Sequence, residues 1–109
     1  MAGADYLSLA IQISEDSLSK GGFPAGAVIV TKNGQIYKSG KSVKYFHGEF
    51  QVIKNALDNE ESLEGAKMYC SMEPCLMCTC SMYWSGCKDV DYVIPKSRKN
   101  IAYNSFALI

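Results

Sequence analysis

The sequence has no excess of either charge. Its 11 lysines and arginines balance 11 aspartates and glutamates, so the formal net charge is zero. A domain built mainly to grip nucleic acid usually carries excess positive charge, so the composition does not favour a polyanionic partner. No apolar run approaches the length of a membrane span, and the opening MAGADYLSLAIQ lacks the basic region of a secretory signal. We therefore expect no membrane contact.

Side chains that bind metals are also scarce. Histidine occurs once, as His47, and there are 5 cysteines. An odd number of cysteines cannot pair completely within one chain, which favours a reduced, cytoplasmic protein. Hydrophobic residues make up 48% and charged residues 20% of the sequence, the balance of an ordinary globular protein. Its 109 residues are enough for one core, so we expect a single domain over residues 1–109.

Apolar periodicity and turn residues predict seven elements. Helices are expected over residues 4–20, 47–57 and 75–86, and strands over 25–31, 35–38, 67–71 and 90–94. Asn33-Gly34 is a strong hairpin signal between the first two strands. This order predicts an α/β fold with a mixed sheet that helices cover.

Three finer features of these elements are also predicted. The strands over 25–31 and 90–94 are expected to be buried, because their sequences are nearly continuous apolar runs. Leu18 and Leu57 are assigned to the apolar faces of the first two helices. Residues 96–99 are expected to form a basic turn.

The stretches HGEF and SMEPCLMCTC gather the chemically reactive side chains. Cys78 lies one helical turn beyond Cys75 on the same face, whereas Cys80 lies about 200° round the axis from Cys78 and faces away. His47 and Glu49 would diverge in the middle of a helix. They can converge with Cys75 only at a site beyond the helix N-termini.

Such a site suits a metal ion, Zn2+ in particular. Helix N-termini favour negative charge and lower cysteine pKa values, so they favour the thiolates that zinc binds. Three protein ligands, His47, Cys75 and Cys78, would leave the fourth zinc position open, as in catalytic sites. Glu49 would then be the base beside an activated water.

Other interpretations stay open at this point. Cys70, Cys80 or Cys87 could supply a fourth ligand and make a closed Cys3His site in a non-catalytic, structural-zinc binding module. The Cys-x-x-Cys pair could instead be a thioredoxin-like redox pair, or cysteines used as small core residues. The redox interpretation leaves the histidine and the glutamate unexplained.

Taken together, HGE at 47–49 and PCLMC at 74–78 resemble the H-x-E … P-C-x-x-C signature of the cytidine and deoxycytidylate deaminase superfamily. FPAGAV at 23–28 is similar to its strand-opening segment, EPC and MC resemble its nucleobase and tRNA-adenosine branches, and HGE resembles fungal cytosine deaminase. The resemblance covers roughly residues 5–95. It implies a three-layer α-β-α sandwich, C-terminally short here, because relatives usually continue with further elements.

The resemblance also implies the chemistry of the site. His47, Cys75 and Cys78 would bind Zn2+, and Glu49 would carry a proton from the attacking water to the ring nitrogen and on to the leaving ammonia. The backbone N–H of Cys75 would hold the attacking oxygen. The implied reaction is hydrolytic deamination, in which an amino-bearing ring carbon becomes a carbonyl.

Substrate contacts are expected from Phe23, Ala25, Gly26 and Ala27. Many family members place an asparagine after the second strand, but GKS stands there in this chain, so Ser42 is the expected substitute. We expect a free base, nucleoside or nucleotide as substrate, with a cytosine or guanine type favoured. The alternative is a polynucleotide deaminase acting on tRNA adenosine or single-stranded DNA cytosine.

Two surface features bear on partners. Lys38, Lys41 and Lys44 precede His47 together with two aromatic residues, and this loop is either plainly solvated or contacts a phosphate or a stacked base. Met82-Tyr83-Trp84 is interpreted as core plus an oligomer face, so we expect a homodimer through the third helix.

Overall fold

Three helices and four strands make up the described part of the chain, residues 3–95, in the computed structural model. The helices are α1 (Gly3–Ser19), α2 (Gly48–Leu57) and α3 (Leu76–Ser85), and the strands are β1 (Ala27–Val30), β2 (Ile36–Lys38), β3 (Lys67–Met72) and β4 (Asp89–Ile94). All seven predicted elements are present in the predicted order. The predicted basic turn over 96–99 lies outside the described residues.

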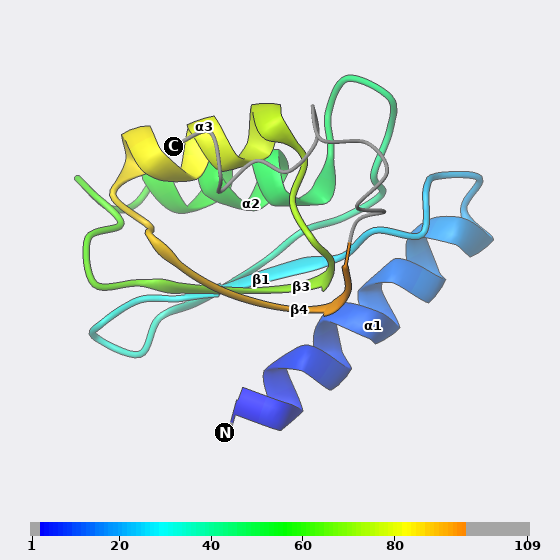
Figure 1. Ribbon diagram of the computed structural model, residues 1–109, viewed down its shortest axis with the longest axis horizontal. Helices are drawn as coiled ribbons and strands as arrows, with labels where there is room; N and C mark the ends of the chain where they lie inside the picture. The colour runs from blue at the N-terminus through cyan, green and yellow to red at the C-terminus, as the bar shows by residue number, and fades with distance from the viewer. Residues whose placement is uncertain (1–2, 96–109) are drawn as a thin grey trace.

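The four strands form one sheet in the order β2-β1-β3-β4. Strand β1 pairs antiparallel with β2 and β3, whereas β3 and β4 run parallel. Helices α2 and α3 lie side by side on one face of the sheet, and α1 covers the other (Figure 1). The predicted α/β three-layer sandwich with a mixed sheet is therefore confirmed. Within residues 3–95, no helix has the length and apolar character to span a membrane.

Strand β1 is buried on both faces, as its apolar sequence predicts. Ala27 and Ile29 belong to the apolar cluster between the sheet and the α2–α3 layer. Val28 points to the opposite face, because strand side chains alternate, and packs with Tyr6 and Ala10 of α1. The sheet thus lies between two apolar layers, one against α1 and one against α2 and α3.

Two glycines end elements where the backbone must be left-handed. Gly34, with φ 85°, closes the β1–β2 hairpin, and its N–H donates to the Thr31 carbonyl at 2.9 Å. Gly86, with φ 92°, ends α3, and its N–H donates to the Tyr83 carbonyl. Glycine adopts this conformation without the steric penalty of a Cβ atom. Both positions agree with the hairpin and the helix end predicted from the sequence.

Three burial predictions are wrong. Strand β4 is exposed along most of its length, because it lies at an edge of the sheet that the described strands form. Leu18 and Leu57 are also exposed. Each follows directly after a buried residue of its helix, Ser17 or Ala56, and one helical step turns the side chain by about 100° away from the sheet.

Candidate functional site

Helices α2 and α3 bring their N-terminal ends to the same point. His47 is the N-cap residue of α2 and Cys75 is the N-cap residue of α3, yet neither side chain caps its own helix. Cys78 lies in the first turn of α3. The ligand atoms of these three residues all lie within 4.8 Å of one another. The structure therefore brings together the three predicted metal ligands beyond two helix N-termini.

The spacing of these donor atoms fits a zinc ion. His47 Nδ1 lies 3.5 Å from Cys75 Sγ and 3.7 Å from Cys78 Sγ. Zinc binds thiolate sulfur at about 2.3 Å and imidazole nitrogen at about 2.0 Å in a tetrahedron, so nitrogen and sulfur ligands lie about 3.6 Å apart. Two thiolates and an imidazole are also a donor set that suits zinc chemically.

The other nitrogen of the His47 ring is held by the preceding loop. Nε2 lies 3.0 Å from the carbonyl oxygen of Lys44. A carbonyl can only accept, so this contact puts the ring proton on Nε2 and leaves the lone pair of Nδ1 facing the two thiols. A backbone carbonyl on the far ring nitrogen is a common partner of metal-binding histidines. The tautomer therefore also fits metal binding.

The two site thiols ionise unequally in the absence of a cation. Their mutual hydrogen bond is the largest cause: it lowers the pKa of Cys75 and raises the pKa of Cys78. Burial and the nearby Glu49 carboxylate raise the pKa of Cys78 further. The protein alone therefore favours one thiolate and one thiol. A bound cation would stabilise the second thiolate, with help from the positive ends of both helices.

Glu49 places a carboxyl group against these donors. The residue is only 4% exposed, and its Oε2 lies 3.6 Å from Cys78 Sγ. Burial is the largest influence on Glu49 and raises its pKa, and the Cys75 charge adds to the rise, while its own backbone N–H lowers the pKa. A buried carboxylate without a cationic partner is costly, so this group is suited to holding and releasing a proton.

The other cysteines do not complete a closed site. All five cysteines are unpaired, and the group of potential ligands found within residues 3–95 contains no fourth side chain. Cys80 lies outside the group, as its helical phase predicts. Cys87 Sγ donates to two backbone carbonyls, and Cys70 lies in the apolar core. The described residues therefore form a three-donor site, not the Cys3His alternative.

Three of the residues predicted to contact a substrate lie along the chain that leads past the site. Phe23 is exposed, and its N–H donates to the Ser42 carbonyl at 2.8 Å. The Ala25 carbonyl oxygen lies beside Gly48, the first residue of α2, and Ala27 is buried beneath that helix. Their contact with a substrate stays a prediction.

The two remaining residues, Gly26 and Ser42, have structural contacts that the motif did not predict. A Cβ atom at Gly26 would collide with the backbone of Ala10, so glycine allows α1 to pack directly on the sheet. Ser42 is 1% exposed, and its Oγ accepts the N–H of Gly48 at 3.1 Å. Ser42 thus caps α2 in place of His47, whose side chain is turned to the thiols. A cap this far before a helix has no sequence signature.

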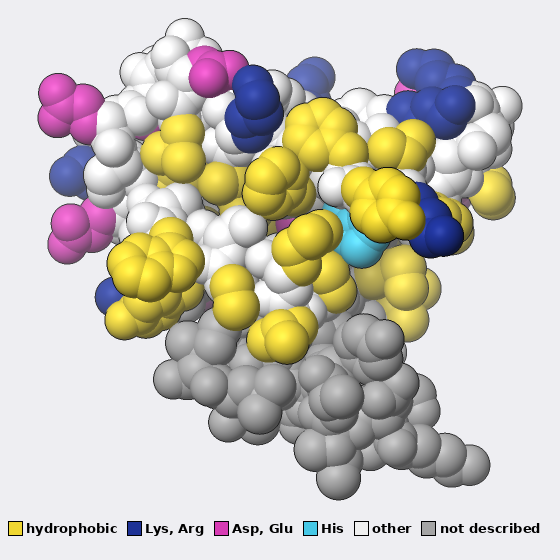
Figure 2. All heavy atoms as spheres, turned by 90° about the horizontal axis from the view of Figure 1, so that it is seen from above, with side chains coloured by type: hydrophobic (Ala, Val, Ile, Leu, Met, Phe, Trp, Pro, Cys, Tyr) yellow, Lys and Arg dark blue, Asp and Glu magenta, His cyan; other side chains and the backbone are white. Residues whose placement is uncertain are grey.

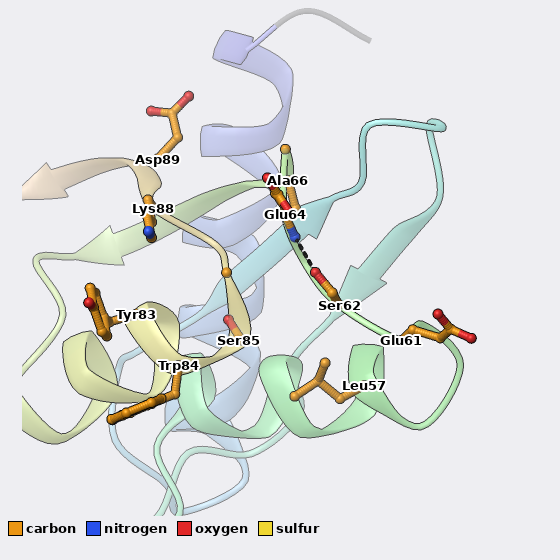
Figure 3. A pocket seen from close by; sticks show the side chains of 12 residues that line it. Leu57, Glu61, Ser62, Glu64, Ala66, Tyr83, Trp84, Ser85, Lys88 and Asp89 are labelled. Atoms are coloured by element: carbon orange, nitrogen blue, oxygen red, sulfur yellow. Dashed lines mark hydrogen bonds between the residues drawn. The ribbon is translucent and has the colours of Figure 1, made fainter.

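A hollow that the described residues line lies at the opposite ends of the two helices. It has a volume of about 700 Å3 and lies between Leu57 at the end of α2, Tyr83 and Trp84 of α3, and Lys88 (Figure 3). Its walls carry carboxylates and serines, but the described residues form no metal-binding group there. In the view of Figure 2, the single histidine lies among hydrophobic side chains and beside a basic one. The chemistry therefore belongs to the N-terminal ends of the helices.

Comparison with known proteins agrees with this geometry. Residues 3–94 match the model of a family described as the cytidine and deoxycytidylate deaminase zinc-binding region. A solved structure of guanine deaminase from Bacillus subtilis superposes with a TM-score of 0.81 and 26% identity, covering 99% of this chain and 74% of that one.

Two curated relatives are more similar in sequence. A tRNA-specific adenosine deaminase of Aquifex aeolicus is 33% identical over 92 residues, which cover 78% of this chain and 61% of that protein. A probable cytosine deaminase of Schizosaccharomyces pombe is 33% identical over 86 residues, which cover 74% of this chain and 53% of that protein. The chain therefore spans between half and two thirds of the length of these relatives.

Proposed function

The chain belongs to the cytidine and deoxycytidylate deaminase zinc-binding family, and we propose that it is a zinc-dependent hydrolase that deaminates an amino-substituted ring and releases ammonia. The proposed substrate is a small molecule, either a free base, a nucleoside or a nucleotide, of the cytosine or guanine type. The names of the Schizosaccharomyces and Bacillus relatives support this choice. The zero net charge supports a substrate smaller than a nucleic-acid strand.

The Glu49 carboxyl group carries this proposal. A purely structural zinc site needs no carboxyl beside its ligands, and burying one without a cationic partner destabilises the fold. Here the carboxyl lies against Cys78, and burial raises its pKa toward the range in which a group can both accept and donate protons. A carboxyl group with these properties is suited to proton transfer.

Each residue of the site has a distinct part in the proposed reaction. Zinc, when held by His47, Cys75 and Cys78, supplies a Lewis acid that makes water nucleophilic near neutral pH. Glu49 accepts one proton as the water oxygen attacks the amino-bearing ring carbon, and delivers it to the adjacent ring nitrogen. Glu49 then moves the second proton of that water to the amino group. The C–N bond breaks, ammonia leaves and the ring carbon becomes a carbonyl.

The surrounding backbone supplies orientation. We assign the N–H of Cys75 to hold the attacking oxygen, because Cys75 is the N-cap residue of α3 and the N-terminal end of a helix carries positive partial charge. Phe23, Ala25 and Ala27 lie on the chain that passes the start of α2, where a flat ring could lie beside Glu49. Phe23 offers an exposed aromatic face there.

Ammonia release across a panel of substrates tests this function. The panel contains cytosine, guanine and adenine, each as base, nucleoside and nucleotide, with zinc-loaded protein at constant zinc occupancy. We expect release from at least one cytosine- or guanine-type compound, and none from the matched Glu49→Gln protein. Zinc-loaded, folded protein that releases ammonia from none of these compounds would contradict the small-molecule proposal.

A second candidate, deamination of a polynucleotide, is favoured by the loop before His47. Tyr45 is 81% exposed, and Lys44 Nζ lies 5.5 Å from the centroid of its ring. An exposed ring beside a cation can stack a base and contact a phosphate. The name of the Aquifex relative includes tRNA.

Salt dependence separates the two candidates. A protein that makes 6–10 phosphate contacts loses about 10³–10⁵ in affinity between 50 and 200 mM salt. We expect activity on a nucleoside or base to exceed that on any oligonucleotide and to change little with salt. Activity on tRNA or single-stranded DNA that falls steeply with salt, and is absent on nucleosides, would establish the second candidate instead.

We also propose that the protein forms a homodimer through α3. Met82 is buried in the core, whereas Tyr83 and Trp84 beside it are exposed, Trp84 by 85%. Hydrophobic side chains gather on this face of the molecule (Figure 2). A contiguous exposed apolar surface is typical of an interaction site, and a second copy is the partner always present. Light scattering at micromolar concentration should give the mass of a dimer; a monomer mass would contradict it.

A further inference from the structure

Gln51 is a polar residue buried on α2, one helical turn after His47. It is 7% exposed, and its amide makes three hydrogen bonds to the loop before the helix. Its Oε1 accepts the N–H of Gly40 at 3.1 Å, and its Nε2 donates to the carbonyl oxygen of Phe46 at 2.8 Å and to that of Lys41. A flipped amide would set its oxygen against two carbonyls, so the orientation of this side chain is fixed.

We propose that Gln51 is a positioning residue that holds loop 40–46 so that the Lys44 carbonyl orients the His47 imidazole. The inference rests on the proposed function only in taking His47 as a metal ligand. It does not depend on which substrate is used, or on turnover.

The loop geometry links Gln51 to the imidazole. Val43 and Phe46 exchange two backbone hydrogen bonds, of 3.2 and 3.1 Å, so the chain between them makes a tight turn with Lys44 near its tip. The Gln51 amide bonds to Gly40 and Lys41 before this turn and to Phe46 at its end. The turn then places the Lys44 carbonyl 3.0 Å from His47 Nε2.

Gln51 also fixes the other partner of that contact. Its backbone N–H donates to the His47 carbonyl at 2.9 Å, the first hydrogen bond of α2. Gln51 therefore holds His47 through a backbone hydrogen bond. Its side chain holds the loop that carries the Lys44 carbonyl, the acceptor for the imidazole. An apolar residue at this position would remove all three side-chain hydrogen bonds. The Phe46 carbonyl would keep the Val43 N–H, but the Gly40 N–H and the Lys41 carbonyl would lose their Gln51 partner.

A separate anchor limits the effect of losing Gln51. The N–H of Ser42 donates to Ser17 Oγ at 2.8 Å, and the Oγ of Ser42 accepts from Gly48. Without Gln51, the loop therefore stays anchored at Ser42, while the turn that carries the Lys44 carbonyl loses its hydrogen bonds to α2. We expect a misoriented imidazole rather than an unfolded loop.

The main test replaces Gln51 by methionine, which has a similar length and no amide. Zinc affinity is measured by competition with a chromophoric chelator. The two ring nitrogens of His47 are followed by nitrogen-15 NMR, and they need no assignment because the chain has a single histidine. We expect Gln51→Met to weaken zinc binding about tenfold, the lower end of the range for partners of metal ligands. In the metal-free protein, both ring nitrogen shifts should move toward those of free imidazole.

Ser85→Ala is the matched control. Ser85 is equally buried and its Oγ donates to the Met82 carbonyl at 2.7 Å, but it lies at the far end of α3. This variant should lose stability through a broken buried hydrogen bond, while the His47 ring shifts and the zinc affinity stay as in the wild type.

Two results would overturn the proposal. The first is a folded Gln51→Met protein with wild-type ring shifts and wild-type zinc affinity. The second is a Ser85→Ala protein that shows the same losses as Gln51→Met, because the losses would then reflect stability alone. If Gln51→Met does not fold, Gln51→Glu carries the same comparison, since it keeps the bond from Gly40 and loses only the two donated bonds. Neither readout needs turnover, so a failed deaminase assay leaves the test intact.

Discussion

The two ends of the α2–α3 helix pair differ in what they bury. Their N-terminal ends hold the Glu49 carboxyl and the Cys78 thiol almost completely out of water. Their C-terminal ends leave Leu57, Tyr83 and Trp84 exposed (Figure 3). Transfer free energies favour the reverse arrangement, in which apolar groups are buried and ionisable groups are exposed. The same two helices therefore depart from the rule twice, and each departure indicates a different kind of site.

Helix polarity explains why the two ends cannot exchange roles. A helix N-terminus carries unpaired N–H groups and positive partial charge, which favours thiolates and carboxylates beside it. The C-terminal ends carry negative partial charge, and the chain that follows α2 contains Glu60, Glu61 and Glu64. An anionic metal site is thus favoured at the first end and disfavoured at the second.

Removing a metal ligand should have the largest effect on the N-terminal ends of the two helices. Cys75→Ala or Cys78→Ala should abolish zinc binding and all turnover, because two donors cannot hold the ion in this open site. Metal analysis should find about one zinc per wild-type chain and essentially none in these variants. Cys80→Ala and Cys87→Ala are the controls and should keep zinc. Zinc loss in either control would indicate the closed structural site instead.

Replacing the buried carboxyl should have the next largest effect. Glu49→Gln keeps the shape of the side chain and the three donors, so zinc content and fold should remain. Turnover should fall by at least ~10²-fold, the usual contribution of a positioned proton-transfer group. Ammonia release at the wild-type rate by a zinc-loaded Glu49→Gln protein would remove the proposed mechanism.

The pH dependence of stability tests the burial of Glu49 without reference to turnover. Burial raises the pKa of Glu49 in the folded, metal-free protein, so the protonated form is favoured there. This contribution to stability is complete below the ordinary glutamate pKa of about 4.3, and is lost as pH rises through the raised folded pKa. Urea unfolding of metal-free protein should show wild type losing stability relative to Glu49→Gln over that window. A constant difference between them would show that Glu49 is not perturbed by its burial.

At the opposite end of the helices, a substitution should change the site least. Trp84→Ser should alter the free energy of unfolding of the monomer by no more than about 0.5 kcal/mol, because an exposed side chain makes few stabilising contacts. Zinc content should stay at the wild-type level. The mass by light scattering should fall to that of a monomer. A dimer mass in the variant would place the interface elsewhere.

The sequence predicted the metal donors and the helices that carry them, but not the residues that hold them in place. Helical phase separated Cys78 from Cys80 correctly, because it depends only on positions along one helix. Gln51 and Ser42 were not predicted as supports, because their partners are backbone groups of a loop or of another element. Nothing in composition or spacing marks such a contact.

Burial was likewise predictable where it depends on local sequence, and not where it depends on the position of an element in the fold. The continuous apolar run of β1 predicted a strand buried on both faces, and the structure confirms it. A similar run in β4 did not predict its exposure, because an edge position depends on the order of strands in the sheet. Gly26 likewise has no local signal for its role, which arises because α1 crosses directly over it.

Residue types and local spacing predict the chemistry of the site: a histidine, two cysteines and a glutamate at spacings that can converge at helix N-termini. These properties are local, since donor type belongs to the side chain and direction follows from the helical period. Tertiary structure decided how that chemistry is held. It made Ser42 the cap of α2, because the His47 side chain faces the thiols, and it placed the Lys44 carbonyl at Nε2 of the imidazole. Those contacts join atoms distant along the chain or carried by the backbone, and only the packed fold fixes the distances between them.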